Sequence, residues 1–382
     1  MKRKIAAITT SRADYSHLYW PLRDLSIHPA IDLRILACGS HVSPEFGHTV
    51  EQIELDRLPI ASRIECLLSS DTDIGMAKTI GIATLGLAEV LGEMRPDLVL
   101  LIGDRYELMA PACVALALRI PIAHIEGGEI TEGAIDDTVR NAITKMSHIH
   151  FTATALARQR VIAMGEDEKR VHWCGAPSLD HLNRQRLRTR DELERTLGLD
   201  LAQRSILVAY HPVTIMRDTL QEVDSLFKAL DALPDQMLFS YPNADAGSRA
   251  LRERTKLFVA GRKNARMWVN LDPVTYWSLL KCMDLFVGNS SSGIMETPAF
   301  AVPTVNVGRR QKGRERARNI IDAEPATESI LGKIQIAKSV SFRESLDDVQ
   351  NPYGNGTASR KIVEVLTTAP ISPEILLKHR RC

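Results

Sequence analysis

The chain has 382 residues, more than one ordinary hydrophobic core supports, and two domains are therefore expected. Apolar residues make up 45% of the sequence and charged residues 25%, as in ordinary globular proteins. The formal net charge is +1, so neither a nucleic acid nor a membrane surface is expected as a partner.

The beginning of the chain is basic and then apolar, up to Ser11. This apolar run is shorter than the apolar region of a secretory signal, and we interpret it as a first β-strand. We expect no stretch of membrane-spanning length. The cysteines form no C-x-x-C pair, which predicts buried free thiols and a cytoplasmic protein. They are Cys38, Cys66, Cys113, Cys174, Cys282 and Cys382.

Short apolar runs alternate with segments of helical periodicity through the first half of the chain. This alternation predicts a parallel sheet with helices on both faces. The expected helices are Tyr15–Leu25, Thr79–Glu93 and Glu107–Leu118. The expected strands are Ile5–Thr9, Ile31–Ala37, Leu98–Ile102, Ile120–Ile125, His150–Thr152 and Arg170–Trp173.

A second series of the same kind begins near Ser205, after a charged segment that we interpret as a helix plus connector. Two Rossmann-like halves of similar layout are therefore expected. The expected strands are Ile206–Tyr210, Gln236–Ser240, Ala265–Val269, Leu285–Val287 and Thr304–Val307. The expected helices are Thr219–Leu230, Gly247–Val259, Pro273–Lys281 and Gly293–Ala299.

Acidic residues stand at strand ends in the first half. Glu126 directly follows a predicted strand, Asp104 follows another strand after one glycine, and Asp136 precedes a predicted helix. In an open parallel sheet, ligands collect outside the carboxyl ends of the strands. Carboxylates crowded at one edge perturb one another's protonation, which suits general acid/base chemistry. Helix capping and solvated turns are the alternative explanation for these acids.

Other polar residues accompany these acids. Asp137 and Arg140 belong to the same helix start as Asp136, and Arg12 and Ser16 follow the first strand. An arginine at a strand end suits an anionic ligand. A capped helix with a surface arginine is the alternative interpretation of this loop.

In the second half, His211 and Asn243 follow predicted strands. A histidine after a buried strand is often a hydrogen-bonded core residue, but its place at a strand end favours a role in a site. A basic run at 308–316, which includes Arg309, follows another strand. It is either a solvated loop or a means of neutralising a nearby phosphate.

The most informative stretch is Phe286–Glu296. An apolar strand ends at Gly288 and leads through serines and a glycine into a predicted helix. Backbone N–H groups at a helix start, with the positive end of its dipole, form an anion site suited to phosphate. Glu296, one turn inside, is placed to accept hydrogen bonds from ribose hydroxyls. A capped helix without a ligand is the alternative.

Taken together, these motifs resemble those of the UDP-N-acetylglucosamine 2-epimerases. The Arg-Ala-Asp-Tyr and Glu-Gly-Gly forms of two loops are similar to the hydrolysing branch, in sialic-acid-type biosynthesis. The matching blocks occur in family order and cover nearly the whole chain. They are Ser11–Tyr15, Gly103–Arg105, His124–Glu129, Ile135–Asp137, His211–Thr214, Pro242–Ser248, Asn289–Glu296 and Asn351–Gly354.

The resemblance implies a GT-B fold, an α/β architecture of two Rossmann-like domains with parallel sheets facing across a cleft. We expect an N-terminal domain at 1–180, a nucleotide-binding domain at 181–355, and a C-terminal helix within about 356–382 that packs back on the first domain. The resemblance also suggests a homodimer or homotetramer. No metal or redox cofactor is expected.

The implied reaction converts UDP-N-acetylglucosamine and water into N-acetylmannosamine and UDP, by elimination of UDP to a glycal and then hydration. By position, the resemblance assigns catalysis to Asp104, Glu126 and Asp136, with Glu126 or Asp104 as the base at C2. His211 is assigned to the nucleotide-sugar site and is the fourth catalytic candidate. The expected substrate contacts are Arg12, Ser16, Asp137, Arg140, Asn243, Ser290, Ser291, Ser292, Gly293, Glu296 and Arg309.

Two departures from the family pattern leave the sugar open. Ile102 stands where a histidine commonly precedes the Gly-Asp-Arg block, and Glu132–Ala134 lengthens the segment before the paired aspartates. The alternative substrate is UDP-2,4-diacetamido-2,4,6-trideoxyglucose, on the path to legionaminic acid. A GT-B glycosyltransferase and a nucleotide-sugar-binding regulator without catalysis are alternatives of other classes. The clustered acids favour elimination chemistry over both.

Overall fold

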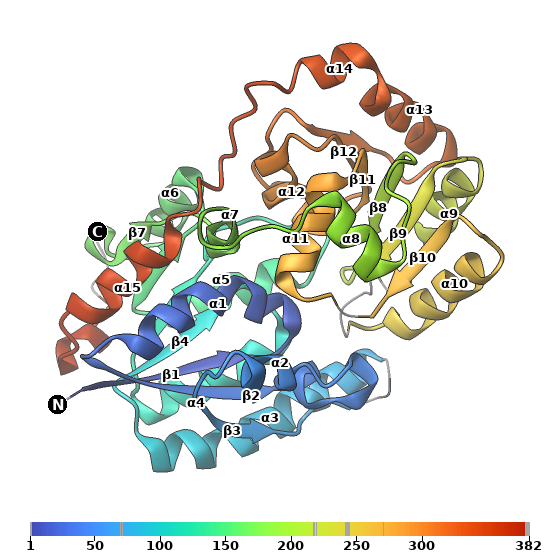
Figure 1. Ribbon diagram of the computed structural model, residues 1–382. Helices are drawn as coiled ribbons and strands as arrows, with labels where there is room; N and C mark the ends of the chain where they lie inside the picture. The colour runs from blue at the N-terminus through green and yellow to red at the C-terminus, as the bar shows by residue number, and fades with distance from the viewer. Residues whose placement is uncertain are drawn as a thin grey trace. The chain divides into compact units, whose positions relative to one another are not determined.

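The computed structural model describes residues 2–68, 70, 72–216, 218, 220–240, 245–269 and 271–378 (Figure 1). It contains two compact units. The first comprises the residues up to Glu129, Ile135–Asn183 and the residues from Tyr353 onward. The second comprises Ile130–Ala134 and Arg184–Pro352. The domain boundaries expected after residues 180 and 355 stay predictions.

The strands of the first unit are β1 (Arg3–Thr9), β2 (Ile31–Cys38), β3 (Ile60–Ile64), β4 (Leu98–Ile102), β5 (Ile122–Ile125), β6 (Ile149–Thr152) and β7 (Val171–Trp173). They form one parallel sheet in the order β3-β2-β1-β4-β5-β6-β7. The chain starts at β1, proceeds to the β3 edge, and then crosses to β4. This reversal of strand order places the carboxyl ends of β1 and β4 at a switch point, where open sheets bind ligands.

The predicted helices of the first half lie within α1, α3 and the segment that ends in α4, and these predictions are confirmed. Helix α2, helix α6 and strand β3 were not predicted. The helices are α1 (Arg12–Ile27), α2 (Val50–Leu55), α3 (Asp73–Met94), α4 (Met109–Leu118), α5 (Asp136–Met146), α6 (Ala155–Ala163), α7 (His181–Arg184) and α15 (Ala358–Thr368).

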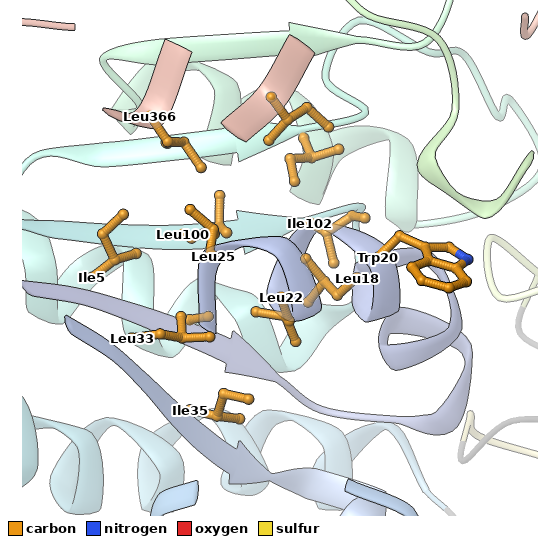
Figure 2. Packing of buried hydrophobic residues seen from close by; sticks show 14 of the residues in the cluster. Ile5, Leu18, Trp20, Leu22, Leu25, Leu33, Ile35, Leu100, Ile102 and Leu366 are labelled. Carbon is orange, nitrogen blue, oxygen red and sulfur yellow. The ribbon is translucent and has the colours of Figure 1, made fainter. Parts of the chain in front are cut away.

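A core between the sheet and helices α1 and α15 holds the first unit together (Figure 2). Leu18, Leu22 and Leu25 recur at helical spacing on α1 and are fully buried against β1, β2 and β4. Ile362 and Leu366 of α15 belong to the same core, so residues from the end of the chain complete the unit. Each such buried side chain stabilises the fold by about 1.5–3 kcal/mol.

The second unit has a six-stranded parallel sheet of similar plan. Its strands are β8 (Ser205–Ala209), β9 (Gln236–Ser240), β10 (Ala265–Trp268), β11 (Leu285–Gly288), β12 (Thr304–Val307) and β13 (Ile320–Ala323). They are ordered β10-β9-β8-β11-β12-β13, and the switch point lies between β8 and β11. Two parallel sheets in an α/β fold were expected, and this expectation is confirmed.

The helix predicted at residues 293–299 is shorter than expected. Helix α12 makes a single turn, Ser292–Met295, and a 3-10 turn follows at Thr297–Phe300. Pro298 has no N–H group for a continued α-helix and is accommodated at the start of the 3-10 turn. The other helices are α8 (Arg190–Leu197), α9 (Val223–Asp231), α10 (Ser248–Ala260), α11 (Pro273–Cys282), α13 (Thr327–Lys338) and α14 (Val340–Glu344).

Helix α3 contradicts the expectation that no stretch has the length of a membrane span. Among the described residues it is the one helix long and apolar enough, with a mean hydropathy of 1.5 over an 18-residue window. Only 28% of that window is buried. The described cysteines are free, as predicted: Cys38, Cys66 and Cys174 are buried, Cys282 is half-buried and Cys113 is exposed.

Gly288 ends β11 where that strand runs closest to β8. Its φ is 150°, and a Cβ atom there would lie 2.0 Å from the carbonyl oxygen of Ala209. No side chain fits between these paired backbones. Glycine at this position therefore lets β11 reach its full pairing with β8 before the chain turns.

We predict that Gly288→Ala lowers the free energy of unfolding by about 3 kcal/mol, because the added methyl group forces two strands apart. Gly332→Ala is the matched control, since Gly332 lies in α13 and a Cβ atom there meets no atom within 4 Å. The control should gain roughly 0.5–1 kcal/mol through helix propensity. Urea unfolding followed by circular dichroism measures both. Equal stability of the two variants would contradict the close approach at Gly288.

Candidate active site

The loop after β1 is held by Asp14. Its carboxylate accepts hydrogen bonds from the backbone N–H of Thr10 at 2.9 Å and from Oγ of Ser11 at 2.8 Å. Ser11 is the N-cap of α1, and its hydroxyl accepts from the backbone N–H of Asp14. This arrangement presents Arg12, the first residue of α1, half-buried at the carboxyl edge of the sheet. Ser16 follows one turn later and is also half-buried.

A buried guanidinium organises the acids near β4. Arg140 is fully buried and donates from Nη2 to Oδ2 of Asp104. Its Nη1 donates to the backbone carbonyl of Glu129 at 2.7 Å and to Oδ1 of Asp137 at 3.3 Å. Asp104 and Asp137 keep 21% and 29% of their side-chain surface exposed. The arginine therefore holds two partly exposed carboxylates in place with charge-assisted hydrogen bonds.

Glu126 lies at the end of the neighbouring strand, β5. Its φ of 65° is in the left-handed region, which is uncommon for a residue other than glycine. Its backbone N–H donates to the carbonyl of Phe151 at 2.7 Å, which helps to fix this conformation. Strained backbone of this kind is common at functional sites. Only 10% of the side chain is exposed, so the carboxylate is enclosed and fixed in direction.

His17 was not among the predicted site residues. Its Nδ1 lies 2.8 Å from Oε1 of Glu126, and only 15% of its side chain is exposed. The available signal was a histidine in the second turn of the helix after β1. Spacing along one helix does not reveal a partner more than a hundred residues away.

His124 is a support for this edge of the sheet. Its Nε2 lies 2.7 Å from the carbonyl oxygen of Gly103, which requires a proton on Nε2, and Nδ1 lies 3.2 Å from Oγ1 of Thr144. Burial lowers the pKa of His124 to about 4, so the ring is neutral at pH 7. It fixes the turn that carries Asp104.

Asp136 opens helix α5 as its first residue, and it is half-buried. The residue before it, Ile135, occupies the cap position without a side-chain hydrogen bond. Asp136 is therefore not the N-cap of α5, and the capping alternative does not apply to it. Asp137, next along, accepts from Arg140 and from the side-chain amide of Asn141 at 3.3 Å.

In the second unit, Asn289 links the two strand ends at the switch point. Its Oδ1 accepts from the backbone N–H of His211 at 2.7 Å, and its Nδ2 donates to the carbonyl of His211 at 2.9 Å. This side chain is fully buried. It fixes the backbone of His211, whose residue surface is 9% exposed. Asn289 was part of a recognised motif but was not among the predicted site residues.

In the serine turn, Ser290–Ser292, one side chain supports the structure and the backbone N–H groups before it are placed for a ligand. Oγ of Ser292 donates to Oε2 of Glu296 at 2.6 Å and lies 2.6 Å from the hydroxyl of Tyr276. Among the described residues, no hydrogen bond uses the backbone N–H of Ser290 or Ser291. Ser292 therefore holds the buried Glu296, whereas the N–H groups before it suit an anion. Gly293 lies inside α12, packed on Phe286.

The basic run is only partly a surface loop. Arg309 is 58% exposed and lies 3.7 Å from Glu222. Arg310 and Arg314 are buried, and Arg310 donates to the carbonyl of Asn289. Arg310, the neighbour of the predicted Arg309, therefore places a positive charge against the backbone that leads into the serine turn.

The roles of the predicted site residues stay predictions. The structure brings Asp104, Asp137 and Arg140 into one network and joins Glu126 to His17. Asn243 lies outside the described residues. The described part of the chain contains no group of three or more His, Cys, Asp or Glu residues placed to hold a metal ion.

Comparison with known proteins finds similarity along almost the whole chain. A family model described as UDP-N-acetylglucosamine 2-epimerase matches residues 23–367. The chain is 37% identical to a UDP-N,N'-diacetylbacillosamine 2-epimerase (hydrolyzing) from Legionella pneumophila, over 99% of both chains. It is 36% identical to a GDP/UDP-N,N'-diacetylbacillosamine 2-epimerase (hydrolyzing) from Campylobacter jejuni, over 85% of both.

A UDP-N-acetylglucosamine 2-epimerase from Neisseria meningitidis is 31% identical over 95% of both chains. Among solved structures, UDP-GlcNAc 2-epimerase from Neisseria meningitidis bound to UDP-GlcNAc superposes with a TM-score of 0.81 at 18% identity, covering 95% of this chain and 99% of that chain. This likeness confirms the predicted GT-B fold class.

We predict that Arg140→Met lowers the free energy of unfolding by about 3–5 kcal/mol, because it leaves the Asp104 carboxylate and a buried carbonyl without their donor. Arg34→Met is the matched control, since Arg34 pairs with Asp32 and is 48% exposed. The control should lose no more than about 1 kcal/mol. Urea unfolding measures both, and a similar small loss in both variants would contradict the role given to Arg140.

Proposed function

The chain belongs to the UDP-N-acetylglucosamine 2-epimerase family, and on that premise we propose that it is a hydrolysing 2-epimerase of a nucleotide-linked 2-acetamido sugar. The observation that carries this proposal is the pair of carboxylates at the ends of neighbouring strands, Asp104 after β4 and Glu126 after β5. One is fixed by a buried arginine and the other lies against a histidine. Two carboxylates positioned in this way can remove a proton from a substrate and return a proton to it.

The reaction has two balanced steps. In the first, Glu126 takes the hydrogen of C2 as a proton while the bond from C1 to the diphosphate oxygen breaks, which leaves a C1–C2 double bond and free nucleoside diphosphate. In the second, water adds its oxygen to C1 and a proton reaches C2 from the opposite face. The product is the free sugar inverted at C2.

The residues of the first unit divide this work. The hydrogen on C2 is not acidic, so positive charge must develop at C1 as the diphosphate departs, and a carboxylate near the ring stabilises that charge. We assign this task to Asp104 and proton removal to Glu126, with His17 as its hydrogen-bonding partner. Asp136 handles the water molecule or its proton.

The second unit supplies the nucleotide contacts. We propose that the N–H groups of Ser290 and Ser291 bind the diphosphate and that Glu296 accepts hydrogen bonds from the ribose. Arg12 and His211 stabilise the charge on the departing diphosphate. Asn243, Arg309 and Ser16 remain proposed substrate contacts.

The sugar is proposed to be N,N'-diacetylbacillosamine, which is the 2,4-diacetamido-2,4,6-trideoxyglucose considered as the alternative from the sequence. Support comes from the two relatives at 36% and 37% identity, whose names specify this sugar. UDP-N-acetylglucosamine is the second candidate, favoured by the relative at 31% identity over 95% of both chains. The relatives therefore favour the diacetamido sugar over UDP-N-acetylglucosamine, whereas the loop motifs of the sequence favoured UDP-N-acetylglucosamine.

The test is an NMR analysis of products formed from UDP-N,N'-diacetylbacillosamine, its GDP counterpart and UDP-N-acetylglucosamine, without any acceptor, in heavy water. We expect free sugar inverted at C2, deuterium at C2, and the highest kcat/KM for a diacetylbacillosamine substrate. Higher kcat/KM for UDP-N-acetylglucosamine would overturn the proposed sugar but keep the reaction. An intact donor in all three samples, or inverted sugar without deuterium, would overturn the reaction.

We predict that Glu126→Gln reduces kcat at least about a hundredfold and leaves UDP affinity within about twofold, because the amide cannot accept the C2 proton. Glu364→Gln, at an exposed acid of α15, is the matched control and should keep normal kcat. Steady-state kinetics and calorimetric titration with UDP check both values. Near-normal turnover of Glu126→Gln would refute its assignment as the base.

A further inference from the structure

Two cysteines from neighbouring strands lie together in the core of the first unit. Cys38 is the last residue of β2, and Cys66 follows the end of β3 by two residues. The two strands pair in parallel with Cys38 opposite Ile64, so both cysteines lie at the same end of the sheet. Both belong to the core that α3 and α4 cover, where Cys38 is fully buried and Cys66 is 4% exposed.

The two sulfur atoms are hydrogen-bonded to each other. The thiol of Cys38 donates to the sulfur of Cys66. Sγ of Cys38 also lies 3.7 Å from the carbonyl oxygen of Thr9, so its single proton has two acceptors within reach. Sγ of Cys66 accepts a second hydrogen bond, from the backbone N–H of Gly39 at 3.4 Å. Two donors therefore converge on the sulfur of Cys66.

These donors favour the thiolate form of Cys66. The hydrogen bond from Cys38 has the largest effect and lowers the pKa of Cys66, burial opposes it, and the N–H of Gly39 lowers the pKa further. The nearby Glu107 carboxylate acts against the thiolate, but less strongly. At Cys174, by contrast, burial has the largest effect and raises the pKa to about 12. A stabilised thiolate beside a second thiol is the arrangement of redox-sensitive cysteine pairs.

The cysteine pair packs against the loop that carries Arg12. The backbone N–H and the hydroxyl of Ser40 both donate to the carbonyl oxygen of Thr10, at 2.9 Å and 3.1 Å. A Cβ atom at Gly39 would lie 2.8 Å from the same oxygen, so the backbone that follows Cys38 and this loop are in direct contact. A movement of Cys38 is therefore transmitted to the loop.

We propose that Cys38 and Cys66 form a reversible redox site, in which hydrogen peroxide converts the two thiols into a disulfide. In the first step, the sulfur of Cys66 attacks the O–O bond, becomes a sulfenic acid and releases one water molecule. In the second step, the sulfur of Cys38 attacks the sulfenic sulfur, the S–S bond forms, and the hydroxyl group leaves as a second water molecule. The two thiols lose two electrons and two protons, which the peroxide takes up.

The disulfide changes the end of β2. An S–S bond is about 2.05 Å long, so the two sulfur atoms must approach each other, and the thiol proton that reaches Thr9 is lost. Cys38 then moves toward Cys66, and the loop that carries Arg12 is displaced with it. An effect on turnover rests on the proposed function, whereas formation of the disulfide does not.

The first test is oxidation of the folded full chain by hydrogen peroxide, followed by iodoacetamide labelling, trypsin digestion and mass spectrometry. The two cysteines lie in separate tryptic peptides, residues 35–57 and 64–78. We expect these peptides to be joined within one chain, at least about tenfold faster than Cys174 loses its free thiol, and to be separated by dithiothreitol. A Cys66 thiol that persists as long as that of Cys174, or that joins only to other cysteines, would overturn the proposal.

The second test assigns the two steps. Cys38→Ser keeps a hydroxyl donor beside Cys66 but removes the second thiol, so peroxide should leave a sulfenic acid on Cys66 that dimedone traps. Cys66→Ser should leave Cys38 without dimedone. Circular dichroism verifies the fold of both variants. More dimedone on Cys38 in the second variant than on Cys66 in the first would overturn the assigned order.

Turnover tests the effect on the Arg12 loop. We expect the disulfide form to have a kcat/KM for the nucleotide sugar at least about fivefold lower than the reduced form, with recovery in dithiothreitol. Cys66→Ser should have the same kcat/KM before and after peroxide. Unchanged kcat/KM in the disulfide form would overturn the effect on the loop but keep the redox site. A chain that forms the disulfide and turns over no nucleotide sugar in either state would contradict the proposed function alone.

Discussion

Parallel pairing of β4 with β5 is the constraint on which the acidic residues of the first unit depend. Because the two strands run side by side in register, the residues that follow them, Asp104 and Glu126, must emerge at the same edge of the sheet. Two carboxylates so placed need separate partners to stay apart and keep fixed directions. Arg140 serves the first and His17 the second, and each partner comes from a different helix.

The second unit has the same sheet geometry, but its strand ends carry hydrogen-bond donors in place of acids. The diphosphate of the proposed substrate would need donors at the strand ends rather than acids, and the serine turn after β11 has backbone N–H groups suited to that task. Gly288 allows the strand to approach β8, and Asn289 ties the turn to the end of β8 through both atoms of its amide. Backbone donors placed in this way lose no side-chain entropy when an anion binds.

Sequence patterns predicted much of this architecture, because buried parallel strands are continuous apolar runs between helices of regular period. Edge strand β3 was missed, since its residues alternate between half-buried and exposed and resemble a loop. Asp104, Glu126 and the serines were predicted because each lies shortly after the end of a strand. His17 and Arg310 were missed, because a side chain that acts through a distant partner leaves no mark in local spacing.

The burial of Arg140 illustrates the same limit. From the sequence it was assigned to the substrate, as an arginine near acids at a helix start. In the structure its donors are directed to Asp104, Asp137 and a backbone carbonyl. Which of several acids an arginine reaches depends on how α5 packs beside β4 and β5, and composition alone does not contain that information.

The chain passes between its two compact units four times, because Ile130–Ala134 belongs to the second unit while the residues on both sides belong to the first. Because each unit is made of more than one segment, cutting the gene at one point cannot separate one complete unit from the other. Recombination at one point cannot exchange the second unit alone between relatives, since a piece that begins at Arg184 lacks Ile130–Ala134 and carries α15 of the first unit with it. The acidic site and its partner unit are therefore expected to be inherited together, and the family to diversify by substitutions rather than by shuffling of domains.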